Sequence, residues 1–403
     1  MSRKTLIVFL AFFLVLFMGC GKDETQEKNN NNEAITDNSS YYHNVYGHPV
    51  AETKEGFYLS LDNLLYYVDK ETLTPVMLST DNYTWKELSG NDELKQASDA
   101  YAGLNPQIFF VNGKLYLCEE QGFYRLPREG GQRSNVINGD VNFWNNKICY
   151  SKGYFYLVET KLGSEGNSIS SIVPISEEKG NIGDIISFPD ELDGGKDITV
   201  QEIFPFKDKI YLSALLSDED SPIKAYLFDK DQGKGKIFEE QDFYKGQRYG
   251  TQLINEDEGK LMRTICPAIS QNKKPLGRLQ YIDDEGNKVE TDIEREIPWP
   301  QVCISNGKYK YEVPSGVTWI SKAYGSGNGD LEENSKVKMF VKNLQTGKET
   351  FIEDSLVKKH GNYMCSVTSD GWCLIYGSDK LLIINSEGLH LINPEGHKLL
   401  QEN

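Results

Sequence analysis

The residues best suited to chemistry are seven cysteines and five histidines. A thiolate is a nucleophile and a metal ligand, and imidazole serves as a general base or a zinc ligand. No two cysteines have Cys-x-x-Cys spacing, and the histidines do not complete a zinc set. We therefore expect no metal, no cofactor and mostly buried free thiols. Six cysteines fall in predicted strands: Cys118, Cys149, Cys266, Cys303, Cys365 and Cys373.

Cys365 and Cys373 are the one pair whose spacing suits a disulfide. A three-residue loop from Thr368 to Asp370 would put the two cysteines directly opposite each other on neighbouring strands. A two-residue loop would instead put them out of register. The sequence leaves the redox state of this pair open.

Catalytic signatures are missing from the sequence. It contains no Gly-x-Ser-x-Gly elbow, no phosphate-binding loop and no His-Glu-x-x-His. Asp229-x-Asp231 with Gly233 matches only a fragment of a calcium loop and falls in a repeated turn, which favours a solvated turn. A ring-shaped fold can still gather catalytic groups from distant segments, so an enzyme remains an alternative.

Cys20 lies at the end of a segment that predicts export. Arg3 and Lys4 precede thirteen apolar residues, Leu6 to Met18, which is signal-peptide length and short of the ~20 that span a bilayer. The stretch LFMGC at 16–20 resembles the lipobox of bacterial lipoproteins, in which the cysteine takes a diacylglycerol. The resemblance implies that residues 1–19 are removed and that Cys20 anchors the protein to the membrane.

Residues 20–44 follow as a polar, Asn-rich segment with almost no aliphatic side chains. Such a segment cannot bury enough apolar surface to fold. A flexible chain of this length reaches ~25 to 30 Å. We expect a tether that holds residues 45–403 at the extracytoplasmic face of the membrane.

Residues 45–403 repeat one pattern. An apolar strand, a charged turn that usually contains glycine, and a second apolar strand recur seven times at intervals of 42–60 residues. Two further short strands precede most copies, so each repeat supplies four antiparallel strands. The copies begin at Leu65, Phe123, Ile172, Tyr226, Leu279, Met339 and Leu381.

These repeats predict a single all-β domain, a β-propeller. One blade has two apolar faces and cannot bury both alone, so the blades close into a ring. Seven copies predict seven blades, with six or eight as alternatives. Strand 45–52 is a candidate to close the ring against the last blade.

The sequence resembles exported lipoproteins of Firmicutes whose bodies are YWTD or TolB-like β-propellers. The residues that carry the resemblance are the strand end from Tyr66 to Asp69 and the turn from Asn343 to Gly347. Ser369-Asp370-Gly371-Trp372 comes near a sialidase Asp box, but its spacing is wrong. The resemblance implies a propeller fold and no particular ligand.

Candidate ligand-binding residues lie in and near long segments that gather at one end of the predicted blades. Long loops on a rigid scaffold are where binding usually occurs. Aromatic rings there would stack on a sugar or grip a peptide, although packing beneath their own loops is the alternative for each. The segments are 80–105, 162–167, 217–222, 270–277 and 324–335. The candidate residues are Trp85, Tyr101, Trp319, Tyr324, Asn328 and Asp330.

The charge balance restricts the partners. The chain has 43 basic and 60 acidic side chains and a net charge of -17, which argues against a nucleic-acid groove. We expect a membrane-anchored, non-catalytic module that binds a glycan or a protein of the cell envelope. The alternatives are an enzyme of the same fold acting on glycans and a structural part of an envelope complex.

Overall fold

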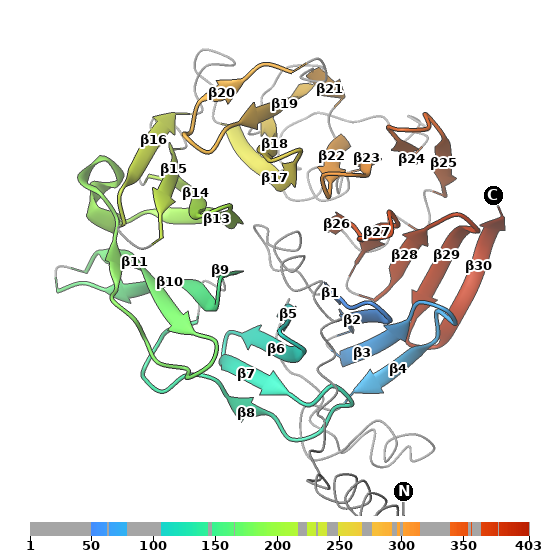
Figure 1. Ribbon diagram of the computed structural model, residues 1–403, viewed down its shortest axis with the longest axis horizontal. Coiled ribbons are helices and arrows are strands. Elements are labelled where there is room, and N and C mark those ends of the chain that lie inside the picture. Colours follow the sequence, from blue (N-terminus) through green and yellow to red (C-terminus); the bar gives the residue numbers. More distant parts are fainter. Residues whose placement is uncertain are drawn as a thin grey trace, which may run out of the picture.

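Seven antiparallel sheets stand around a central axis (Figure 1). This arrangement confirms the predicted β-propeller with seven blades, and the described part of the chain contains almost no helix. The computed structural model describes residues 50–62, 64–78, 106–143, 147–164, 166–216, 224–230, 233–239, 249–267, 276–291, 296–298, 301–314, 339–353, 356, 364–377 and 379–402.

Each of the first four blades takes four consecutive strands. Blade one is β1 (Val50–Glu52), β2 (Gly56–Leu61), β3 (Leu64–Asp69) and β4 (Pro75–Leu78). Blade two is β5 (Gln107–Val111), β6 (Lys114–Glu119), β7 (Gly122–Leu126) and β8 (Ser134–Asn135). Blade three is β9 (Ile148–Ser151), β10 (Tyr154–Leu162), β11 (Ser168–Ser176) and β12 (Ile186–Ser187), followed by the 3₁₀ element η2 (Asp190–Gly195). Blade four is β13 (Thr199–Phe206), β14 (Lys209–Leu215), β15 (Lys224–Asp229) and β16 (Gly235–Glu239).

The fifth and seventh blades each gain an extra strand. Blade five is β17 (Tyr249–Asp257), β18 (Lys260–Pro267), β19 (Leu276–Ile282) and β20 (Lys288–Val289), with β21 (Glu296–Pro298) also paired to β19. Blade six is β22 (Gln301–Ser305), β23 (Lys310–Pro314), β24 (Met339–Asn343) and β25 (Glu349–Ile352). Blade seven is β26 (Met364–Val367), β27 (Cys373–Tyr376), β28 (Leu381–Ile384), β29 (Gly388–Asn393) and β30 (Gly396–Glu402). Among the described residues, no helix has the length and apolar character to cross a bilayer.

Packing between neighbouring blades explains why the strands are apolar on both faces. In β6, Leu115 and Leu117 pack toward blade one, while the intervening Tyr116 and Cys118 pack toward blade three. Successive side chains of a strand point to opposite faces, so a blade between two neighbours needs apolar residues at every position. The described residues accordingly form seven apolar clusters, one at each junction between blades.

The chain direction gives the ring two distinct ends. The turns from first to second strand and from third to fourth strand share one end, the turn face. The loops from second to third strand and the links between blades share the other end, the loop face. On the turn face, φ is positive at both Asn112 (50°) and Gly113 (71°), as a type I′ hairpin requires. The first-to-second turns are residues 53–55, 112–113, 152–153, 207–208, 258–259, 306–309 and 368–372.

Among the described residues, no strand passes between the first and last blades, which corrects the expectation for strand 45–52 over its described residues 50–52. Its described part, β1, pairs with β2 inside blade one, and blade seven is built from five consecutive strands of its own. Closure depends on side chains: an apolar cluster joins blades one and seven, and Lys70 Nζ lies 2.6 Å from Asp370 Oδ2 across the junction. The prediction failed because the C-terminal hairpin β29–β30 already supplies the outer strands of the last blade.

Candidate functional site

The predicted ligand-binding residues are not among those that the structure describes. Trp85, Tyr101, Trp319, Tyr324, Asn328 and Asp330 all lie outside the described residues, and so does Cys20. Of the predicted long segments, 162–167 is described apart from residue 165, and it connects β10 to β11 on the loop face as expected. Its Leu162 side chain is 85% exposed. The ligand surface on the loop face therefore stays a prediction.

The structure places Cys365 and Cys373 diagonally rather than directly opposite each other. Cys365 pairs with Ile375, and Cys373 pairs with Val367. Diagonal neighbours on one face of a sheet have side chains ~7 to 8 Å apart, whereas a disulfide needs Cβ atoms about 4 Å apart. Neither cysteine forms a disulfide and both are buried, and the same holds for Cys118, Cys149 and Cys303.

The turn explains this correction. The three-residue loop is 369–371, one residue later than expected, because Thr368 N donates to Trp372 O. Such a hairpin ends on a left-handed residue, and Gly371, with φ of 85°, fills that position. Moving the loop by one residue moves every strand partner by two.

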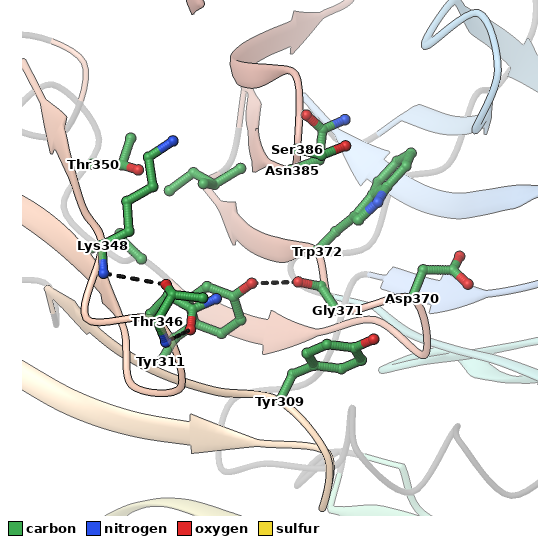
Figure 2. A pocket seen from close by; sticks show the side chains of 13 residues that line it. Tyr309, Tyr311, Thr346, Lys348, Thr350, Asp370, Gly371, Trp372, Asn385 and Ser386 are labelled. Carbon is green, nitrogen blue, oxygen red and sulfur yellow. Dashed lines mark hydrogen bonds between the residues drawn. The ribbon is translucent and has the colours of Figure 1, made fainter. Parts of the chain in front are cut away.

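A groove of about 340 Å³ lies between blades six and seven on the turn face. Figure 2 shows Lys348 and Thr350 on one side and Trp372, Asn385 and Ser386 on the other. The lining residues from blade six are Tyr309, Tyr311, Val341, Asn343, Thr346, Lys348 and Thr350. Those from blade seven are Asp370, Gly371, Trp372, Ile384, Asn385 and Ser386.

Two aromatic side chains, Trp372 and Tyr309, line one end of the groove. The Trp372 side chain is half-buried, and its ring centroid lies 6.0 Å from the ring centroid of Phe57 in blade one. Tyr309 packs on Gly371 so closely that a Cβ there would lie 2.8 Å from the ring. The absence of a side chain at Gly371 therefore permits this close approach. The result is a pair of half-buried aromatic side chains at the rim of a polar depression.

Tyr311 connects the two blades beneath this rim. Burial raises its pKa to about 12, even though a hydrogen bond from Asn343 lowers it. The hydroxyl therefore stays protonated at physiological pH, and it donates to the carbonyl oxygen of Gly371. Through these two hydrogen bonds Tyr311 joins Asn343, at the third-to-fourth turn of blade six, to the first-to-second turn of blade seven.

The charged groups of the groove differ in their pairing. Asp370 is the one carboxylate among the lining residues, and its Oδ2 lies 2.6 Å from Lys70 Nζ, which lies at the same distance from Glu52 Oε1. Lys348 is exposed and makes no ion pair within the described part of the chain. Among the described residues, no group of three or more His, Cys, Asp or Glu could hold a metal ion. The groove can stack rings and exchange hydrogen bonds with a ligand, so its chemistry is that of binding.

Sequence reasoning missed this site because its parts are distant in the chain. Asn343 and Asn385 are each the first residue of a third-to-fourth turn, and the sequence identifies both turns. Blades one, four and five have Asp69, Asp229 and Asp283 at the same turn position. This change from aspartate to asparagine in two consecutive repeats was the available signal.

No protein-family model matches the chain, and no curated protein matches it. Among solved structures, it is similar to the Dos1 propeller, with a TM-score of 0.45 and 13% identity over 86% of each chain. It is also similar to a puromycin-hydrolyzing peptidase of Mycobacterium tuberculosis, with a TM-score of 0.46, 12% identity, and coverage of 85% of this chain and 50% of that one. It is similar as well to an acylaminoacyl peptidase of Pyrococcus horikoshii, with a TM-score of 0.43 and 10% identity. That match covers 91% of this chain and 54% of the peptidase. The chain thus spans about half of each peptidase, and the blade count rests on the strand pairing itself.

Proposed function

We propose that this protein is a lipid-anchored, extracytoplasmic lipoprotein whose β-propeller is a non-catalytic module that binds a glycan of the cell envelope. The observation that carries the proposal is the groove between blades six and seven, which joins the half-buried Trp372 and Tyr309 to hydroxyl, amide and ammonium groups. Sugars present apolar ring faces edged by hydroxyls, and that pattern matches aromatic side chains beside polar partners.

The size of the groove favours a saccharide over a protein. About 340 Å³ lies within the ~300 to 1,000 Å³ typical of small-molecule sites. A stable protein complex instead buries ~800 Å² on each partner. A short stretch of glycan fits such a groove, with further units extending over the exposed turns.

The single carboxylate among the lining residues of the groove favours binding over glycan hydrolysis. Glycosidases usually act with two carboxyl groups, ~5 to 9.5 Å apart, on either side of the scissile bond. The lining has only Asp370, and its Oδ2 lies 2.6 Å from the ammonium of Lys70. A glycan-cleaving enzyme is therefore the second candidate, and no group in the groove supports it.

The position of β1 agrees with an anchor at Cys20. β1 starts on the loop face and runs toward the turn face. A tether joined to Val50 would therefore reach the domain from the loop face, with the groove at the opposite end. Such an arrangement would turn the groove away from the membrane and toward the envelope glycans.

Binding to the detergent-solubilised full chain tests the proposal. Envelope glycan fragments should bind, and Ser386→Trp, which fills the groove from an exposed turn, should weaken binding at least tenfold without changing the melting temperature. Tyr154→Ala removes an exposed aromatic of blade three and is the matched control.

Two results would overturn parts of the proposal. If Trp85→Ala and Trp319→Ala abolish binding while Ser386→Trp leaves it intact, the ligand occupies the loop face. Turnover of the bound glycan would establish the enzyme instead.

The anchor has its own test. A Cys20→Ser variant expressed in a bacterial host should stay unprocessed or be released into the medium. Retention and cleavage like those of the unaltered protein would contradict lipidation.

A further inference from the structure

The hairpin of β10 and β11 in blade three extends beyond its neighbour in blade two on the loop face. β10 has nine residues and β6 has six, and both strands start directly after a first-to-second turn. At about 3.3 Å per residue, β10 runs roughly 10 Å farther along its strand direction than β6 does. The hairpin tip, residues 162–168, therefore stands out from the loop face.

Leu162, at the hairpin tip, is the most exposed large apolar side chain in the described part of the chain. It is 85% exposed, and the next values are 53% for Ile185 and 46% for Phe351. Ile169, which is 42% exposed, belongs to the same hairpin and pairs with Lys161. Single apolar residues scattered over a surface need no explanation, but two at the end of one protruding hairpin indicate a contact surface.

The hairpin tip is held by the link that follows blade three. Asp197 N donates to Ser168 O at 2.9 Å, and Ser168 N donates to Asp197 Oδ1 at 2.7 Å. Within the tip, Gly163 N donates to Asn167 O at 2.7 Å and closes the loop between the strands. Because the hairpin is already ordered, burying its tip against a partner costs little conformational entropy.

The two apolar side chains of the hairpin lie on opposite faces. Leu162 pairs with Ser168, and the adjacent pair, Lys161 with Ile169, projects to the other face. A flat protein surface covers one face of a hairpin, whereas a fluid bilayer surrounds a tip that enters it end-on. The arrangement therefore favours a lipid surface as the partner of the hairpin tip.

The start of β1 places the proposed anchor at the same end of the ring. Val50 begins β1 on the loop face, and residues 20–44 upstream are the expected tether. A flexible segment of this length reaches ~25 to 30 Å, so the loop face would stay close to the lipid headgroups. A tether gives an effective concentration on the order of millimolar, at which a weak apolar contact is populated. The anchor therefore supplies a reason why two apolar side chains suffice.

The charges near the hairpin tip argue against an electrostatic contact with lipid. Residues 161–169 contain a single lysine, Lys161, whose Nζ lies 2.9 Å from Glu159 Oε2. The adjacent η2 contributes the carboxylates of Asp190, Glu191 and Asp193. Binding through anionic headgroups needs clustered lysine and arginine. Apolar side chains must therefore supply the attraction of this tip to a bilayer.

We infer that the tip of the β10–β11 hairpin inserts Leu162 and Ile169 into the lipid leaflet that carries the anchor. The inference rests on the proposed lipid anchor at Cys20 and adds the surface on which the domain rests. Such a contact fixes the loop face on the membrane, and it leaves the groove between blades six and seven facing away from the lipid.

Quenching of tryptophan fluorescence by brominated lipid tests the contact. The full-length chain, purified from bacterial membranes, is reconstituted into phosphatidylcholine vesicles whose acyl chains carry bromine. Relative to the unaltered chain, Leu162→Trp should add a component that this lipid quenches about twofold or more, and high salt should leave the quenching unchanged because an apolar contact is not screened. Tyr154→Trp, at the turn-face end of the same strand and 43% exposed, is the matched control and should add an unquenched component.

A second reporter allows Leu162 itself to be changed. Ile169→Trp places a tryptophan on the other face of the hairpin and should also be quenched by the brominated lipid. Adding Leu162→Asp to this variant should reduce the quenching to the level of the Tyr154→Trp control, because an ionised side chain at the tip opposes entry into lipid. Leu162 and Ile169 are both exposed, so the melting temperature should not change.

The outcomes separate this contact from the proposed anchor. If the chain sediments with the vesicles while Leu162→Trp is quenched no more than Tyr154→Trp, the lipid contact is wrong, the anchor survives, and a protein is the alternative occupant of the tip. Quenching of Tyr154→Trp alone would show that the opposite face meets the membrane. If the chain does not stay with the vesicles and Leu162→Trp is unquenched, both the anchor and the contact are wrong.

Discussion

Glu177 illustrates how one residue joins two blades. Its carboxylate, in the turn after β11, accepts hydrogen bonds from Lys114 (2.7 Å), Tyr116 (2.5 Å) and Asn112 (3.1 Å) of blade two. Burial alone would raise its pKa, but these donors outweigh burial and lower the pKa below its ordinary value of 4.5. The Glu177 carboxylate is therefore charged in the folded protein and links blade two to blade three.

The lowered pKa of Glu177 predicts a stability difference that depends on pH. Because the folded-state pKa lies below the unfolded one, the stabilisation is complete above about pH 4.5 and is lost as pH falls through the lower value. Glu177→Gln should reduce the free energy of unfolding by about 1 to 3 kcal/mol at pH 7, the range for hydrogen bonds to charged groups. The difference in free energy of unfolding between the unaltered protein and Glu177→Gln should shrink below about pH 4, where the carboxylate becomes protonated. Urea titrations across pH measure this, and exposed Glu178→Gln should stay within about 0.5 kcal/mol.

The buried cysteines predict a protein with unreactive thiols. Burial raises the pKa of Cys118, Cys149, Cys365 and Cys373. The neighbouring Cys365 raises the pKa of Cys373 further. A thiol reagent at pH 8 should therefore label none of these groups before unfolding. After denaturation without reductant, at least the five described free thiols should react. A count of four or fewer would contradict this expectation, since a disulfide between Cys365 and Cys373, which the register of β26 and β27 argues against, removes two of the six thiols that follow Cys20.

At the scale of elements, the hairpin turns set the register of each blade. Gly259 has φ of 73° and open space around its α-carbon, whereas Gly180 has φ of 65° and lies against the Val136 carbonyl. The first needs glycine for its backbone angle alone. The second also needs glycine because a Cβ would lie 1.7 Å from Val136 O.

The two glycines predict different costs for the same substitution. Gly259→Ala should destabilise by about 1 to 2 kcal/mol, the cost of a left-handed alanine. Gly180→Ala should cost clearly more, because the backbone of the turn must move. Thermal unfolding of both variants measures the difference, and Gly259→Asn should recover part of the loss since asparagine tolerates this conformation. Equal losses at both sites would contradict the argument.

At the scale of the whole molecule, the closure between blades one and seven is the critical junction. Lys70 Nζ lies 2.6 Å from Glu52 Oε1 and 2.6 Å from Asp370 Oδ2, and the side chains of Lys70 and Glu52 are 9% and 1% exposed. Ser369 N and Oγ also donate to the Glu52 carboxylate, at 3.0 and 2.8 Å. In the part of the chain that the structure describes, this network and the apolar cluster around it join blade one to blade seven.

Removing the lysine should therefore destabilise the junction between blades one and seven. Lys70→Met leaves Glu52 buried without its cation, and we expect a loss of about 3 kcal/mol in the free energy of unfolding. The double variant Lys70→Met/Glu52→Gln should recover at least about 1 kcal/mol, since no charge stays buried. Lys152→Met removes an exposed ion pair with Asp208 between blades three and four, and it should cost less than about 1 kcal/mol. A larger loss at Lys152 than at Lys70 would refute the role of this closure.

The sequence by itself determined the all-β class, the number of blades and the third-to-fourth hairpins, because those features are local. Each copy found in the sequence, from β3–β4 to β28–β29, pairs as predicted, since apolar strands flanking a polar turn need only their neighbours to form. The register of Cys365 depended on which residue of its turn is left-handed, which a one-residue uncertainty in the loop conceals. Only the tertiary structure decided how the ring closes and where the groove lies. Asn343 and Asn385 belong to different repeats and share a groove only because closing the ring sets the turns of adjacent blades side by side.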